Sequence, residues 1–161
     1  MDRLIDTFAN ELIDSGLATK RDVVGCSSAE IEELERYFDL ELPASYKDFL
    51  EKMGKGAGLF LQGTDVFYHR LFEIREAMEE VLGLDGNPFS LTKKTFVFSS
   101  HQGYIFHFFD TSQHLDDPRV YGYREGELQI KLLGESFIGF LKSCIQEQIA
   151  SWGTVTKRVF W

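Results

Sequence analysis

Residues that build reactive centres are scarce in this sequence of 161 residues, which contains two cysteines and four histidines. Cys26 and Cys144 are too few to hold zinc by themselves, and they form no C-x-x-C pair. In a reducing compartment we expect free thiols rather than a disulfide. The spacing places Cys144 on the apolar face of a helix, in the core. Cys26 precedes a helix and is expected to be partly exposed; as a nucleophile it would need a histidine nearby in space.

The histidines form no catalytic pattern; they are His69, His101, His107 and His114. We expect His101 in a hairpin loop, His107 within a strand and His114 in a loop, and no two have the spacing of metal ligands on a helix. Aspartates near His114 leave a histidine–carboxylate metal site as an alternative to solvated loop residues. No nucleophile elbow or dinucleotide-binding glycine pattern is present. We therefore predict no enzyme, with no catalytic residue, no metal and no cofactor.

Long apolar runs are also missing, and none approaches the roughly 20 residues that a membrane-spanning helix needs. The first residues do not resemble a secretory signal, because polar side chains interrupt the apolar stretch that a signal requires, namely Asp2, Asp6, Asn10 and Glu11. We therefore expect a cytoplasmic protein.

Positive charge is scarce, since 17 lysines and arginines face 26 aspartates and glutamates and the net charge is −9. Nucleic acid and anionic membranes both need a basic surface, so the composition argues against them as partners. Complementary charge favours a basic protein instead. Solubility alone is the simpler explanation of the negative charge. Other observations have to decide between solubility and a basic protein partner.

Aromatic residues are abundant, with 15 Phe and 6 Tyr, as in a sheet packed against helices. Helical spacing of apolar residues predicts helices over residues 1–14, 27–38, 43–53, 71–82 and 137–148. Ser27 and Glu30 match a capping box at the start of the second helix. Short apolar runs predict strands over residues 59–61, 96–98, 104–109, 120–123 and 128–132, of which the last four form two hairpins.

Helices come first, an antiparallel meander follows and a helix closes the chain, so we predict an α+β fold without βαβ repeats. No linker, repeat or low-complexity segment divides the sequence, which indicates one domain over residues 1–161. The glycine-rich segment 54–58 is predicted to be a turn. It follows a helix and lacks the Ser or Thr of a phosphate-binding loop.

One segment carries a family motif. Ser28-x-x-Ile31-x-x-Leu34-Glu35 is followed by Leu42-Pro43-x-x-Tyr46-x-x-Phe49-Leu50 and by the glycine-rich turn. The strands over 96–98 and 106–110 and a helix that begins near Ser136 agree in order. From about residue 24 to residue 145 the chain resembles the SUKH superfamily, which includes fungal cell-wall-synthesis regulators and bacterial toxin-immunity proteins. The N-terminal helix, residues 1–15, and the tail, residues 152–161, lie outside the resemblance.

The motif residues themselves have a mainly structural interpretation. Their spacing places Tyr46, Phe49 and Leu50 in the core. Leu42-Pro43 breaks the chain before a helix, because a residue that precedes proline avoids helical geometry. We expect Glu35 to hold a helix end or a loop by hydrogen bonds. The motif therefore predicts the fold and says little about the site.

The resemblance implies a non-enzymatic immunity protein that binds and neutralises a cognate bacterial toxin, frequently a nuclease or deaminase. An acidic protein can cover the basic cleft of such a toxin. Residues 27–52 hold eight acids and three bases, and residues 110–127 hold five acids and two bases. We predict the second region as the partner-binding surface, because its acids lie in or beside loops: Asp110, Asp116, Asp117, Glu125 and Glu127.

Two other functions stay open. The fungal relatives suggest an interaction or scaffold module in cellular regulation, and the aromatic sheet with a polar pocket around His107 would suit a small-molecule-binding domain. A homodimer is compatible with each of these functions. Trp152 and Trp161 both fall in the tail, which we expect to add a strand to the sheet; a partner interface is the alternative.

Overall fold

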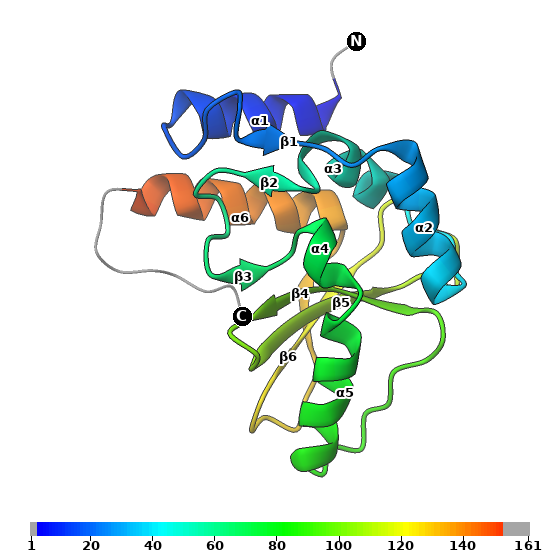
Figure 1. Ribbon diagram of the computed structural model, residues 1–161. Coiled ribbons are helices and arrows are strands. Elements are labelled where there is room, and N and C mark those ends of the chain that lie inside the picture. The colour runs from blue at the N-terminus through cyan, green and yellow to red at the C-terminus, as the bar shows by residue number, and fades with distance from the viewer. Residues whose placement is uncertain (1–2, 153–161) are drawn as a thin grey trace.

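A five-stranded antiparallel sheet lies at the centre of the computed structural model, which describes residues 3–152 (Figure 1). Its strands follow one another in chain order: β3 Thr64–Asp65, β4 Thr95–His101, β5 Ile105–Asp110, β6 Val120–Arg124 and β7 Lys131–Gly134. A separate two-stranded sheet pairs β1, Val23–Val24, with β2, Gly56–Ala57. The predicted α+β fold with an antiparallel meander is confirmed.

Within residues 3–152, six helices surround the sheets: α1 Leu4–Asp14, α2 Ser28–Phe38, α3 Ala44–Met53, α4 Tyr68–Leu71, α5 Ile74–Leu84 and α6 Phe137–Ser151. The ring of Tyr46 on α3 packs against Phe96 on β4 and Phe137 on α6, with centroids 5.4 and 5.3 Å apart. α1 packs on α3 and α6 from outside, whereas α5 lies against β4 on the other side of the sheet (Figure 1). The aromatic residues therefore fill a core between helices and sheet.

Both predicted hairpins are present. β4 and β5 are joined by a tight turn in which Gln102 and Gly103 have φ angles of 51° and 77°, and glycine adopts such angles easily. Every residue of β4 is buried, in agreement with its position between β3 and β5. β6 and β7 pair with Tyr121 opposite Leu132.

The capping box predicted at the start of α2 is confirmed. Ser27 Oγ accepts the backbone N–H of Glu30 at 3.2 Å, and Glu30 Oε1 accepts the N–H of Ser27 at 2.9 Å. Lys55 Nζ lies 2.7 Å from Glu30 Oε2. Hydrogen bonds from Lys55 and Ser27 lower the pKa of Glu30 to about 2, so the charged carboxylate ties the start of α2 to the loop after α3.

Three predicted elements differ in the structure. Residues 59–61 form a turn rather than a strand, because Gln148 of α6 binds the backbone N–H of Leu61 at 3.0 Å and the carbonyl of Leu59 at 3.1 Å. The helix predicted over 71–82 is divided into α4 and α5, and α5 continues through Gly83. β7 begins at Lys131 rather than Leu128, because side chains beyond α5 hold the preceding turn.

Two side chains are also more buried than expected. Cys26 is 7% exposed, and burial raises the pKa of its thiol to about 11. His101 is the last residue of β4 and is buried rather than lying in the hairpin loop. Cys144 lies in the core as predicted, and burial raises its pKa as well.

The tail falls almost entirely outside the described residues. The expectations of an added strand or an interface concern residues 153–161, which the structure does not describe; Trp152 is 47% exposed just after α6. No helix within residues 3–152 has the length and apolar character needed to cross a bilayer.

Candidate functional site

The motif that carries the family resemblance forms part of the scaffold. Glu35 Oε2 accepts the backbone N–H of Leu42 at 2.9 Å and lies 3.5 Å from Lys47 Nζ, so Glu35 fastens the loop between α2 and α3. Pro43 is the residue before α3. Tyr46, Phe49 and Leu50 are at most 1% exposed. These residues therefore fill the core or hold the loop between α2 and α3 in place.

Three of the predicted binding residues lie in or next to the β5–β6 loop, residues 111–119. Asp110 ends β5, Asp116 and Asp117 lie in the loop, and all three are exposed. The carbonyl of Asp116 accepts the N–H of Ser45 at 2.9 Å. Asp117 Oδ1 accepts the N–H of Ile138 in the first turn of α6 at 3.0 Å. These bonds anchor the backbone of the loop to α3 and the Asp117 carboxylate to α6.

A surface hollow of about 450 Å³ lies beside this loop. Its lining combines carboxylates with apolar groups and one arginine: Asp110, Gln113, Leu115, Asp117, Pro118, Arg119, Tyr121 and Glu135. Arg119 Nε lies 2.9 Å from Glu135 Oε2, and both side chains are mostly exposed. Three carboxylates against one guanidinium leave the hollow acidic.

The loop also contacts the other acidic segment that the sequence indicated. A smaller hollow of about 130 Å³ separates the loop from the Leu42-Pro43 segment. Glu41 Oε2 lies 3.9 Å from His114 Nδ1, and both side chains are exposed. The two acidic regions, separate in the sequence, therefore meet on one surface. Sequence analysis missed the contributions of Glu41 and Glu135, because only the fold brings them to the loop.

The other two predicted residues lie at the opposite end of β6. Glu125 and Glu127 belong to the turn between β6 and β7, beyond Arg124, whereas the β5–β6 loop precedes Val120. The turn is held by the segment that follows α5: Asp85 Oδ2 accepts the N–H of Gly126 at 2.7 Å, and Asn87 Nδ2 donates to the carbonyl of Glu127 at 3.2 Å. The structure therefore divides the five predicted carboxylates into two groups.

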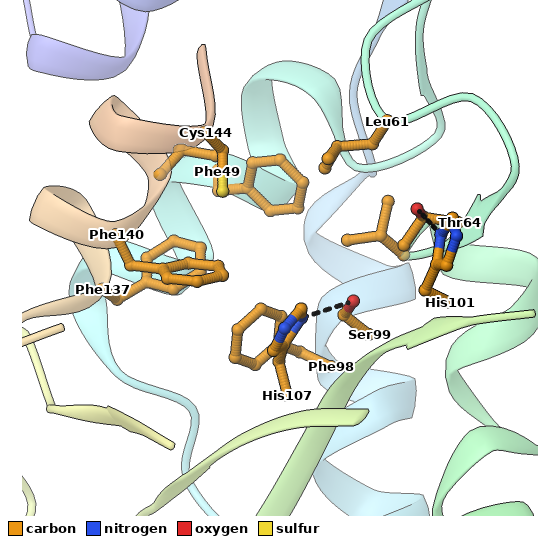
Figure 2. Close-up of a pocket in the computed structure, with 12 residues that line it drawn as sticks. Phe49, Leu61, Thr64, Phe98, Ser99, His101, His107, Phe137, Phe140 and Cys144 are labelled. Carbon is orange, nitrogen blue, oxygen red and sulfur yellow. Dashed lines mark hydrogen bonds between the residues drawn. The ribbon is translucent and has the colours of Figure 1, made fainter. Parts of the chain in front are cut away.

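A second candidate is a buried cavity between α6 and the sheet (Figure 2). Its polar side chains are paired: His107 Nδ1 lies 3.0 Å from Ser99 Oγ, and His101 Nδ1 lies 2.9 Å from Thr64 Oγ1. Phenylalanine rings and Cys144 form much of the remaining wall (Figure 2). The volume of about 40 Å³ holds a water molecule, whereas a benzene-sized ligand needs a cavity of about 150 Å³. The cavity is thus too small for a metabolite.

Metal ligands are not gathered anywhere in the described part of the chain. Among residues 3–152, no group of three or more His, Cys, Asp or Glu side chains is arranged to hold a metal ion. Near His114 the short contact is with Glu41, and Asp110 instead binds the N–H and hydroxyl of Ser112 at 2.8 and 2.9 Å. The chemistry of the β5–β6 loop surface is therefore that of charge, hydrogen bonding and apolar contact.

The fold and this surface define a small α+β protein in which a helical scaffold presents an acidic loop. The chain belongs to the SMI1 / KNR4 family (SUKH-1), whose sequence model matches residues 25–143. The match covers α2 through the first two turns of α6 and leaves α1 outside. No curated protein matches the chain.

Proposed function

We propose that this protein is an immunity protein that binds and neutralises a bacterial toxin, of the nuclease or deaminase kind, and that it acts by binding rather than by catalysis. The observation that carries the proposal is the acidic surface of the anchored β5–β6 loop, with Asp110, Asp116 and Asp117 exposed. Family membership and the net charge of −9 support the same function.

The physical basis is electrostatic complementarity. A toxin that acts on nucleic acid presents a basic cleft, and opposite charge speeds encounter and fixes the register of the complex. The loop is already anchored to α3 and α6, so little conformational entropy is lost when it is covered.

Charge reversal at the loop tests this proposal. Asp117 needs a conservative change, because its Oδ1 accepts a bond from α6, whereas the Asp116 side chain makes no hydrogen bond or ion pair within residues 3–152. The loop variant therefore combines Asp116→Lys with Asp117→Asn. The control variant makes the same change in net charge at two exposed positions of α1, Glu11→Lys and Asp14→Asn. The partner is the toxin recovered by affinity capture from native cells and then purified.

The loop variant should weaken binding about tenfold at low salt and flatten the salt dependence, whereas the α1 variant should bind like the wild type. Equal affinities and equal salt slopes for all three proteins would contradict the proposal.

A regulatory interaction module is the second candidate, because the family resemblance extends to fungal regulators of cell-wall synthesis. The same capture experiment separates the two functions. Stoichiometric recovery of a housekeeping protein, from cells shown to express toxins, would favour the regulatory module. A homodimer remains compatible with either function.

A further inference from the structure

Exposed leucines gather around the β6–β7 hairpin. Leu115 is 49% exposed, Leu132 is 47% exposed and Leu128 is 67% exposed, although isolated exposed apolar residues are the more usual finding on a protein surface. All three fall within 18 consecutive residues of a 161-residue chain.

Leu115 and Leu132 lie beside Tyr121 of β6, and Leu128 lies in the turn of the hairpin. Leu115 lines the larger hollow together with Tyr121. Tyr121 pairs with Leu132 across β6 and β7, and directly opposed residues point to the same face of a sheet. Leu128 lies in the turn whose backbone Asn87 binds, at 3.3 Å from the Leu128 carbonyl. We call Leu115, Tyr121, Leu132 and Leu128 the apolar strip.

The strip is exposed because the covering elements end before it. On this face, Phe89 packs against Phe108 of β5, with centroids 5.5 Å apart, and the Tyr123 hydroxyl of β6 binds Asp85 beyond α5. Phe108 in turn stacks on Tyr121, with centroids 5.8 Å apart. The segment that follows α5 therefore covers the sheet as far as β5 and part of β6, and leaves Tyr121 and Leu132 at the margin.

We propose that the apolar strip is the centre of a single docking surface for a basic protein, flanked by Asp110 and Asp117 at one end and by Glu125 and Glu127 at the other. This inference rests on the proposed function and names the surface that the toxin would cover. β6 has five residues and is roughly 15 Å long at 3.3 Å per residue. A standard interface of about 800 Å² per partner is about 30 Å across, so one partner reaches both carboxylate groups.

The chemistry of the surface selects its occupant. Interfaces combine an apolar centre with a polar rim, which here corresponds to the strip and its carboxylates. The partner should present an apolar ridge with lysine or arginine on both sides. The carboxylates would repel the phosphates of a nucleic acid. A second copy of this chain would place carboxylates against carboxylates, which also repel one another. A basic protein fits both parts of the surface.

The test removes apolar contact without changing charge. Leu115→Ser combined with Leu132→Ser is compared with Leu4→Ser combined with Leu59→Ser, two exposed leucines outside the strip. Binding of the purified toxin is measured as a function of salt. The strip variant should weaken affinity at least tenfold with an unchanged salt slope, because the lost contact is apolar, whereas the control should bind like the wild type.

A second readout needs no purified partner. The photoreactive residue p-benzoylphenylalanine replaces Leu132 or, as the control, Leu4, and crosslinking is performed in native cells. The photoreactive residue in place of Leu132 should crosslink to a basic protein, and the same residue in place of Leu4 should not. Equal crosslinking from both positions, or crosslinking of Leu132 only to a second copy of the chain, would overturn the inference. If loop charge variants weaken toxin binding and strip variants do not, the inference fails while the proposed function stands.

Discussion

Tyr46 combines a fully buried aromatic ring with a hydroxyl that lacks a hydrogen-bond partner among residues 3–152. Its ring packs against Phe96, Phe109 and Phe137, and the side chain is 0% exposed. The hydroxyl has no hydrogen-bond partner among residues 3–152, and burial raises the pKa of this phenol well above its usual value. A buried donor left unpaired costs about 1–3 kcal/mol.

Tyr46→Phe should therefore preserve or increase stability, by up to about 2 kcal/mol, because it removes the unpaired hydroxyl and keeps the ring. The matched control is Tyr123→Phe, which removes a hydroxyl that binds Asp85 and should lower the free energy of unfolding by about 1 kcal/mol. Urea unfolding at neutral pH measures both changes. A loss of stability in Tyr46→Phe as large as in the control would show that the Tyr46 hydroxyl is bonded.

Element contacts explain why some glycines are required and others are not. The segment that enters α2 crosses the end of α3, where Cys26 N–H binds the carbonyl of Leu50 at 2.7 Å and Lys55 N–H binds the carbonyl of Val24 at 2.8 Å. A Cβ atom on Gly25 would lie 1.7 Å from the carbonyl oxygen of Glu51. In contrast, a Cβ atom on Gly83, inside α5, would meet nothing within 4 Å.

Alanine at these two glycines should have opposite effects. Gly25→Ala forces the backbone of two elements apart and should lower the free energy of unfolding by more than about 2 kcal/mol. Gly83→Ala reduces the conformational freedom of the unfolded chain at a helical position. It should therefore raise the free energy of unfolding by about 0.5–1 kcal/mol. Thermal unfolding followed by circular dichroism measures both variants. Similar melting temperatures for the two would contradict the close approach at Gly25.

On the scale of the whole molecule, α1 belongs to the core although the family match begins after it. The match starts at residue 25, yet Ile5, Phe8 and Leu12 are at most 3% exposed against α3 and α6. Arg3 strengthens the attachment at the surface, with its Nη1 2.9 Å from Glu51 and 3.1 Å from Asp48 on α3. α1 therefore packs as an outer layer on α3 and α6.

Phe8→Ala should lower the free energy of unfolding by about 3–5 kcal/mol, because it leaves a cavity between α1 and the helices beneath it. Thr7→Ala, an exposed neighbour on the same helix, should change stability by less than about 0.5 kcal/mol. Denaturant unfolding should remain a single transition in both variants. A small effect of Phe8→Ala would mean that the family domain is stable without α1.

The candidate site shows where prediction from sequence reaches its limit. Loop carboxylates can be recognised by their neighbours in the chain, so Asp110, Asp116 and Asp117 were identified and lie together. Glu125 is predicted from the same segment, and in the structure the length of β6 lies between it and these three residues. The sequence around Leu115 also contained a signal for the apolar strip. A leucine between polar residues of a loop is a candidate for an exposed apolar side chain.

Local spacing and composition determined most of this protein: the positions of the principal helices, the two hairpins, the Ser27–Glu30 cap, the core role of Tyr46 and the excess of negative charge. These features depend on residues close in the chain or on sums over it. Only tertiary structure decided which helix covers which face, that Glu41 meets His114, and that Leu132 stays exposed beside Tyr121. The physical reason is that burial and surface contact depend on packing between distant segments, which the periodicity within each segment does not contain.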